Sequence, residues 1–205
     1  CAIAKRATAW GGANPPPETA NHGVQTNDAS TRGDAPDFSL SDVNGTKHTL
    51  SSYRGKIVVL EWFNPGCPFV KYAYGEGPLR DMPKAELAKG DIVWLAINSS
   101  APGKQGHGLE LNKSSAAQWQ MQQPLLVDED GQVGRLYGAK STPHMFVIDP
   151  SGNLVYRGAL DNAPLGKADG NIVNHVAAAL DAVRSGQAVP TPETTSYGCS
   201  VKYAD

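Results

Sequence analysis

The amino-acid sequence predicts an α/β domain, with a central sheet flanked by helices. Two continuous apolar runs, "IVVL" and "IVWLAI", have the length and the β-branched content of strands that are buried on both faces. Segments with helical periodicity alternate with these strands along the chain. A late hairpin pattern, followed by an amphipathic segment, adds two more strands and a closing helix.

The first half of the predicted domain holds a hairpin, a central strand and an interrupted helix. "FSLSDV" alternates as a strand does, "NG" is a hairpin-turn dipeptide, and "KHTL" supplies the returning strand. The run Lys56–Phe63 predicts a central strand. A helix is expected directly after Cys67, with an interruption at "GEGP" and an end at Gly90.

The second half continues the alternation up to a final helix. "DIVWLAIN" predicts the next buried strand, and the loop "SSAPGKQGHG" leads to a helix at "LELNKSSAAQWQMQ". "PLLVDED" predicts a short strand whose acidic end begins a short helix at "GQVGRLYGA", and "MFVIDPSGNLVYRG" predicts a hairpin with its turn at Asp149–Asn153. One face of the closing helix, in "GNIVNHVAAALDAVRSG", is expected to carry Ile172, Val173, Val176, Leu180 and Val183.

Length, charge and composition bound the organisation of the chain. The 205 residues suit one domain with tails, and the net charge of -2 comes without a basic stripe that would indicate nucleic-acid binding. No apolar run approaches the roughly 18 residues of a membrane-spanning helix. Residues 1–33, rich in Pro, Gly, Asn and Thr, predict a flexible tether; 34–186 form the predicted domain, and 187–205 a C-terminal tail.

The chain has three cysteines: Cys1, Cys67 and Cys199. A first residue that is cysteine, followed by small residues and a polar segment, resembles a processed bacterial lipoprotein, in which that cysteine is acylated. The other interpretation is an arbitrary chain boundary. If Cys1 carries a lipid, the odd count leaves one pair, Cys67 and Cys199.

Cys67 stands where a strand is expected to turn into a helix. Unpaired backbone N–H groups and the positive end of the helix dipole favour a thiolate there, and a thiolate is the nucleophile in disulfide exchange. Pro68 suits the first helical turn, because its missing N–H leaves no hydrogen bond unmade. The alternative is an inert buried cysteine.

Four features, in order, resemble the thioredoxin-like superfamily and its redoxin branch of AhpC/TSA-type peroxiredoxins and membrane-anchored thiol–disulfide oxidoreductases. They are the opening hairpin with its strand, "GCPFVK" at the place of an active-site C-x-x-C-K, "YGAKSTPHMFVID", and the closing hairpin and helix. The resemblance covers about residues 34–186. It implies a thioredoxin fold, in which a central mixed sheet is flanked by helices, with an N-terminal hairpin and extended N- and C-terminal tails.

The resemblance also implies roles for several residues. Cys67 is expected to be the attacking thiol, and Pro143 the family's cis-proline, with Thr142 offering its backbone to an incoming peptide. Glu61 matches the position of thioredoxin's buried acid, where a raised pKa would suit a proton acceptor. The alternative for Glu61 is a carboxylate turned outward or paired with a lysine such as Lys71.

The sequence departs from the family at three places. Val70 replaces the second cysteine of the C-x-x-C motif, Asn64 stands where peroxiredoxins have threonine, and no arginine accompanies the proline loop. These departures argue against peroxidase chemistry, although the amide of Asn64 can hydrogen-bond a substrate oxygen.

The missing second sulfur is expected in the tail. "YGCSVKY" contains two tyrosines, a valine and a cysteine, which indicates a segment that folds back onto the domain. It resembles the C-terminal resolving-cysteine arrangement of some redoxins, which implies that Cys199 is the disulfide or resolving partner of Cys67. A free tail cysteine and a bond to another chain are the alternatives.

No cofactor or metal is predicted. A copper site formed by Cys67, His144 and Met145 is the one metal-binding set considered, and it lacks a ligand motif.

The leading functional expectation is an extracytoplasmic protein, anchored to a membrane by lipid on Cys1, that exchanges disulfides with an exported partner protein. An accessory, non-enzymatic subunit of a membrane protein complex is the alternative, and a peroxiredoxin-like peroxidase is the second alternative. The sequence does not indicate the direction of exchange or the oligomeric state.

Overall fold

The structure is a computed structural model of the chain, and it describes residues 33–205. Nearly all of the predicted tether, including the expected lipid attachment site at Cys1, lies outside the described residues. Within residues 33–205, no helix has the length and apolar character needed to cross a membrane.

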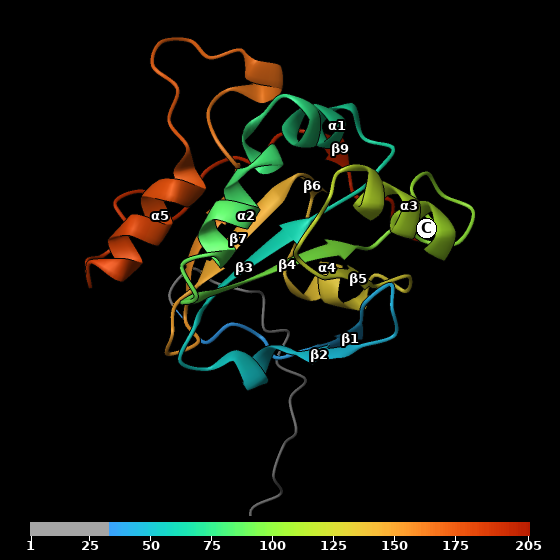
Figure 1. Cartoon of the computed structure of the whole chain (residues 1–205), viewed down its shortest axis with the longest axis horizontal. Helices are drawn as coiled ribbons and strands as arrows, with labels where there is room; N and C mark the ends of the chain where they lie inside the picture. The colour runs from blue at the N-terminus through green and yellow to red at the C-terminus, as the bar shows by residue number, and fades with distance from the viewer. Residues whose placement is uncertain (1–32) are drawn as a thin grey trace, which may run out of the picture.

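The fold is built on a five-stranded mixed sheet with the order β5-β4-β3-β7-β8 (Figure 1). Strand β3 (Ile57–Trp62) is central and runs parallel to β4 (Ile92–Asn98), which in turn is parallel to β5 (Leu125–Val127). On the other side, β7 (His144–Ile148) and β8 (Leu154–Gly158) are antiparallel. These strands correspond to those expected from the apolar runs and the late hairpin.

Helices cover one face of this sheet, and smaller elements cover the other. The first face packs against α1 (Pro68–Gly75) and α5 (His175–Arg184), with α2 (Met82–Leu87) and α3 (Leu109–Gln118) beside them. The other elements are α4 (Gln132–Leu136), the hairpin of β1 (Ser39–Ser41) and β2 (Lys47–Thr49), the 3-10 turns η1 (Leu50–Tyr53), η2 (Pro78–Arg80) and η3 (Pro164–Gly166), and the short strands β6 (Ser141–Thr142) and β9 (Cys199–Ser200). Residues of η1 and α4 pack on the second face.

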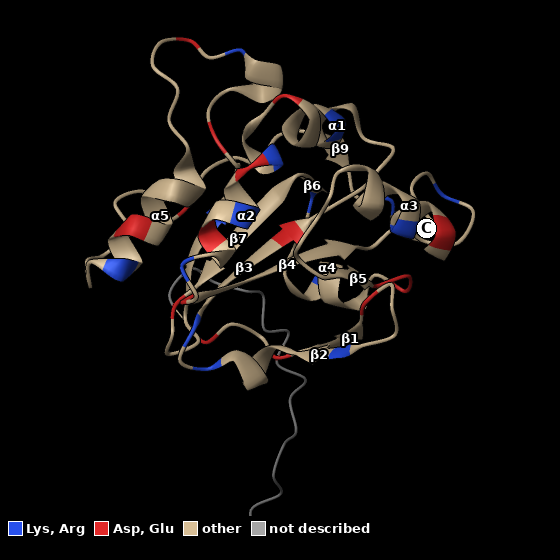
Figure 2. Cartoon of the chain, in the orientation of Figure 1, with Lys and Arg blue, Asp and Glu red and all other residues tan. Residues whose placement is uncertain are grey.

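Strand β3 positions the site because it is buried on both faces. Its side chains alternate, so Val59 and Glu61 face the helices α1 and α5, while Leu60 and Trp62 face the hairpin and α4. All six of its residues are buried, which explains why the strand is a continuous apolar run instead of an alternating one. The single exception in polarity is Glu61, and Figure 2 shows an acidic segment within β3 amid uncharged strands.

The final helix begins later than its apolar pattern predicts. The side chain of Asn174 accepts a hydrogen bond from Ala177 N–H at 2.9 Å, so Asn174 is the N-cap and the helix starts at His175. Ile172 and Val173, expected on the buried face, precede the helix and are 65% and 45% exposed. The prediction for these two residues was wrong because a capping side chain, and not apolar periodicity, sets the start of the helix.

Asp128 joins the end of β5 to the start of α4. Its buried carboxylate accepts hydrogen bonds from the N–H groups of Val133 (3.1 Å) and Gly134 (2.9 Å) and from the hydroxyl of Ser99 (2.6 Å). Two members of the acidic run predicted at this helix start therefore accept hydrogen bonds from its first turn: the buried Asp128, and the exposed Asp130, which accepts one from Gln132 N–H at 3.0 Å.

We expect Asp128→Ala to lower the free energy of unfolding by about 3 kcal/mol, because it leaves three buried donors unpaired. Urea denaturation measures the change. Asp130→Ala is the matched control, since Asp130 is exposed in the same acidic run and should cost less than about 1 kcal/mol. An equal loss for the two variants would show that the Asp128 contacts do not stabilise the fold.

Candidate functional site

Cys67 lies at the N-terminus of helix α1, where the sequence placed it. It is the N-cap residue of α1, with an extended backbone (φ -78°, ψ 125°), and Pro68 occupies the first turn. Its carbonyl accepts the first helical hydrogen bond, from Lys71 N–H at 2.9 Å. The thiol is therefore carried to the end of the central strand on a rigid turn.

Asn64 shapes that turn. Its side-chain oxygen accepts a hydrogen bond from Gly66 N–H (2.7 Å), and its amide donates to the carbonyl of Gln105 (3.0 Å) and lies 3.3 Å from the hydroxyl of Ser100. The residue is fully buried. Asn64 thus ties the turn before Cys67 to the loop after β4. The substrate contact considered from the sequence does not fit, because these polar groups are already paired.

The tail brings Cys199 to Cys67. Strand β9 pairs antiparallel with β6, which sets Cys199 opposite Thr142. The two sulfur atoms lie 2.8 Å apart and both residues are free thiols. The Cys67 thiol also lies 3.1 Å from the carbonyl oxygen of Thr142, to which it can donate. The tail therefore places a second sulfur beside Cys67, on the side of the cis-proline loop.

The environment separates the acidities of the two thiols. Burial disfavours a thiolate at Cys67, but hydrogen bonds from Cys199 and from the N–H of Val70 outweigh it, so the pKa of Cys67 is lowered. Burial and the neighbouring Cys67 raise the pKa of Cys199 to about 11. The environment therefore favours a thiolate at Cys67 over a thiolate at Cys199.

The Thr142–Pro143 peptide bond is cis, as the resemblance implies. Thr142 is buried, and its backbone is paired with Cys199 of the tail. The edge expected to meet an incoming peptide is thus occupied by a segment of the same chain.

Glycine at position 198 permits this close pairing. A Cβ atom there would lie 2.1 Å from the carbonyl oxygen of Thr142, and the backbone has a φ of +121°, which other residues rarely adopt. The cysteine and tyrosines of "YGCSVKY" predicted the fold-back of the tail, and the glycine directly before the cysteine is a further sequence signal of this close approach.

Two tyrosines fasten the tail on either side of Cys199. The Tyr197 hydroxyl donates to the carboxylate of Asp161 at 2.7 Å, and the Tyr203 hydroxyl donates to the carbonyl of Ala139 at 2.8 Å. The guanidinium of Arg135 lies 4.5 Å from the centre of the Tyr203 ring. Cys199 is therefore held at both ends of its segment.

Glu61 is enclosed by groups that the sequence did not predict. It is 0% exposed, and it accepts hydrogen bonds from the hydroxyl of Tyr74 (2.9 and 3.0 Å to its two oxygens) and from the indole N–H of Trp94 (2.9 Å). Burial raises the pKa of Glu61 to about 7, and the two donors oppose the shift. The carboxylate is not turned outward, and these donors take the place of the lysine partner considered from the sequence.

The residues considered for copper do not converge on a ligand set. His144 accepts a hydrogen bond from Lys140 N–H at 3.2 Å through Nδ1, and burial together with the charges of Arg157 and Lys140 lowers its pKa to about 4. Met145 is fully buried in the core. Across residues 33–205, no three His, Cys, Asp or Glu side chains are grouped as metal ligands would be.

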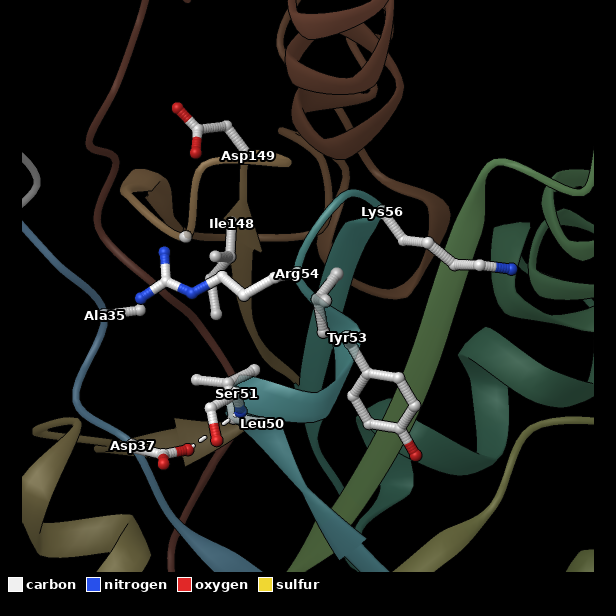
Figure 3. Close-up of a pocket in the computed structure, with 11 residues that line it drawn as sticks. Ala35, Asp37, Leu50, Ser51, Tyr53, Arg54, Lys56, Ile148 and Asp149 are labelled. Atoms are coloured by element: carbon white, nitrogen blue, oxygen red, sulfur yellow. Dashed lines mark hydrogen bonds between the residues drawn. The ribbon is translucent and has the colours of Figure 1, made fainter.

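Three hollows are found at the surface of residues 33–205: one beside the tail, one lined by Tyr74 and Trp119 among others, and one at the end of β3 away from Cys67. A polar groove runs beside the tail and is lined by Ser141, Gly198 and Ser200, among others. A small cleft lies at the other end of β3, where Arg54 reaches over an apolar floor and donates to the carbonyl of Ser151 (Figure 3). The small cleft contains no cysteine and takes no part in the site.

A cysteine at the start of α1, facing a cis-proline loop at the end of a central strand, defines a thioredoxin-fold protein of the redoxin class. Residues 31–157 match the AhpC/TSA family, and the chain belongs to that family.

Curated relatives share only part of the chain. The chain is 32% identical over 121 residues to the thiol-disulfide oxidoreductase ResA of Geobacillus thermodenitrificans (strain NG80-2). This match covers 58% of this chain and 64% of the relative. The thioredoxin-like protein YneN of Bacillus subtilis (strain 168) is 27% identical over 118 residues, 58% of this chain and 65% of its own length. The chain thus spans less than two thirds of the curated relatives it matches.

Solved structures extend the likeness. A hypothetical protein from Sinorhizobium meliloti 1021 is 29% identical, with a TM-score of 0.72, and the match covers 86% of this chain and 97% of that one. A putative thiol:disulfide interchange protein DsbE from Chlorobium tepidum is 26% identical, with a TM-score of 0.51 over 62% of this chain and 83% of its own.

Proposed function

We propose that the protein exchanges disulfides with an exported partner protein through the Cys67–Cys199 pair. The observation that carries the proposal is a pair of thiols whose sulfurs lie 2.8 Å apart at a helix N-terminus, with pKa values shifted in opposite directions. Exchange needs one thiolate and a second sulfur within bonding reach, and this pair supplies both. Relatives named thiol-disulfide oxidoreductase ResA support the reaction class.

In the reaction, the pair cycles between a dithiol and a disulfide. Two electrons and two protons pass between the pair and a dithiol or disulfide of the partner, through a mixed disulfide. Thr142 and Pro143 hold the tail beside Cys67, and Glu61 is the buried group whose pKa suits it to accept or release a proton near neutral pH.

We place this activity on the extracytoplasmic side of a bacterial membrane, with the chain held by lipid on Cys1. The proximity of Cys67 and Cys199 supports this location, because disulfides persist in oxidising compartments and this pairing leaves only Cys1, of the three cysteines, for another modification.

A second candidate is a non-enzymatic accessory subunit of a membrane protein complex. The observation that favours it is the complete burial of Cys67 beneath a fastened tail, which suits a closed scaffold. The peroxidase alternative has less support, because the polar groups of Asn64 are paired inside the protein.

We expect Cys67→Ser and Cys199→Ser each to lower the turnover of insulin reduction, or of oxidation of a reduced test protein, by roughly 100-fold or more, since either change removes one sulfur of the pair. Cys1→Ser is the control and should retain turnover in the soluble assay.

Peroxide consumption, measured with the same variants, distinguishes a peroxidase from a protein that only exchanges disulfides. If wild-type protein shows no turnover that depends on Cys67 in any of these assays, the enzymatic proposal fails and the accessory role stands.

A further inference from the structure

We propose that an outside partner exchanges with the sulfur of Cys199, and that Cys67 is the internal sulfur that leaves and returns. The inference rests on the proposed disulfide exchange and reverses the roles implied by the family resemblance, in which Cys67 meets the partner. It depends on which sulfur a partner can reach.

The two cysteine residues differ in exposure. Cys67 is 0% exposed and belongs to the buried core beneath α1, together with Val70 and Met145. Cys199 is partly exposed and packs on the surface of that core. Disulfide exchange requires three sulfur atoms to approach one another, so a partner sulfur must touch the one that it attacks. From outside, that sulfur is Cys199.

Uncovering Cys67 would require the tail to give up a series of contacts. Cys199 is paired to Thr142, and beyond it Val201 N–H donates to Lys140 O (3.1 Å) and Ala101 N–H donates to Lys202 O (2.8 Å). The tyrosines at 197 and 203 fasten both ends of this segment. Exposing Cys67 would break all of these contacts, whereas attack on Cys199 breaks none of them.

A partner thiolate attacks the Cys199 sulfur of the oxidised pair and forms a mixed disulfide with it. The Cys67–Cys199 bond breaks, and its electron pair goes to Cys67, which becomes a thiolate beside the N–H of Val70. A second partner thiolate then attacks the partner's own sulfur in the mixed disulfide. Cys199 is released and takes up a proton; the partner dithiol is oxidised to a disulfide, and the pair is reduced by two electrons. The reverse steps reduce a partner disulfide, so the assignment holds for both directions.

The chemistry of the leaving sulfur agrees with this order. The thiol of lower pKa leaves faster from a disulfide, and the helix N-terminus favours the thiolate at Cys67. An attack on Cys67 would instead expel Cys199, whose thiolate is disfavoured by burial beside Cys67.

Mapping the mixed disulfide tests the proposal. Oxidised full-length protein carrying Cys1→Ser is mixed with reduced glutathione, quenched with acid at short times and analysed by peptide mass spectrometry. We expect glutathione on Cys199 with Cys67 free. Glutathione found mainly on Cys67 would overturn the assignment.

Single-cysteine variants give a second measurement that does not need an oxidised pair. In the Cys1→Ser background, Cys67→Ser leaves Cys199 alone, and Cys199→Ser leaves Cys67 alone. For each, the rate with bulky glutathione disulfide is divided by the rate with small iodoacetamide, which cancels differences in thiolate content. We expect this ratio to be about tenfold or more higher for Cys199, and the ratios to become equal in guanidinium.

Equal ratios in the native state, or a higher ratio for Cys67, would contradict the proposal. The proposed function has its own outcome: if glutathione maps to Cys199 while no test protein is turned over, exchange with a partner protein fails and the order of access remains.

Discussion

Replacing Gly198 with alanine is expected to separate the tail from the cis-proline loop and to slow formation of a Cys67–Cys199 disulfide about tenfold or more. The added Cβ would lie 2.1 Å from the Thr142 carbonyl oxygen, on a backbone whose φ is +121°. Left-handed strain and overpacking together cost about 3 kcal/mol, and the tail avoids this cost by leaving β6. Timed alkylation and mass spectrometry in a glutathione redox buffer measure the rate.

Gly170→Ala is the matched control for this experiment. Gly170 also has a positive φ, +94°, but nothing lies within 4 Å of its Cβ position. It therefore carries the backbone strain without the clash, and it should leave disulfide formation unchanged. If Gly198→Ala forms the disulfide at the wild-type rate, the close approach of residue 198 to Thr142 is not what brings the sulfurs together.

Replacing Glu61 with glutamine is expected to remove a pH dependence of stability worth roughly 3 kcal/mol. The pKa of Glu61 is raised from 4.5 to about 7 in the folded protein, because the group is buried. The folded state therefore holds a proton that the unfolded state has lost between these values. The resulting stabilisation is complete below pH 4.5 and disappears as the pH rises through 7.

Urea denaturation at pH 5 and pH 8 measures this effect. Between pH 5 and pH 8, the free energy of unfolding of wild-type protein should fall by roughly 3 kcal/mol more than that of Glu61→Gln. The lowered pKa of His144 works in the opposite direction, but it is common to both proteins and cancels in the comparison. Glu76→Gln, at an exposed position, should behave as wild type. Parallel pH profiles for wild type and Glu61→Gln would show that Glu61 does not titrate near neutrality.

Local signals in the sequence predicted most of the fold and part of the site. Short runs of consecutive residues predict three elements: the strand β3, the turn at Cys67, and the hairpin of β7 and β8. Each lies where its sequence pattern indicated. The start of α5 was missed because one capping side chain, Asn174, overrides the apolar period.

The groups around the reactive residues were less predictable, because they come from distant parts of the chain. Tyr74 and Trp94 contact Glu61 from α1 and β4, and their positions in the sequence do not predict these hydrogen bonds. Position 198 needs glycine because the carbonyl of Thr142 leaves no room for a Cβ atom there. Thr142 lies 56 residues earlier, in a strand that pairs with the tail. The family resemblance located the proline loop, and only the three-dimensional structure shows that the tail covers it.

The distance in sequence between the paired cysteines has a topological consequence. The two sulfurs stand 132 residues apart in the chain, on elements that both belong to the folded core. As a dithiol the protein is a linear chain, and as a disulfide it contains a ring from residue 67 to 199 that takes in every strand of the central sheet except β3. Closing so large a ring removes about 5 kcal/mol of entropy from the unfolded chain in the chain-entropy account. Redox state and folding are then one linked equilibrium, in which each oxidised molecule is also a more stable one.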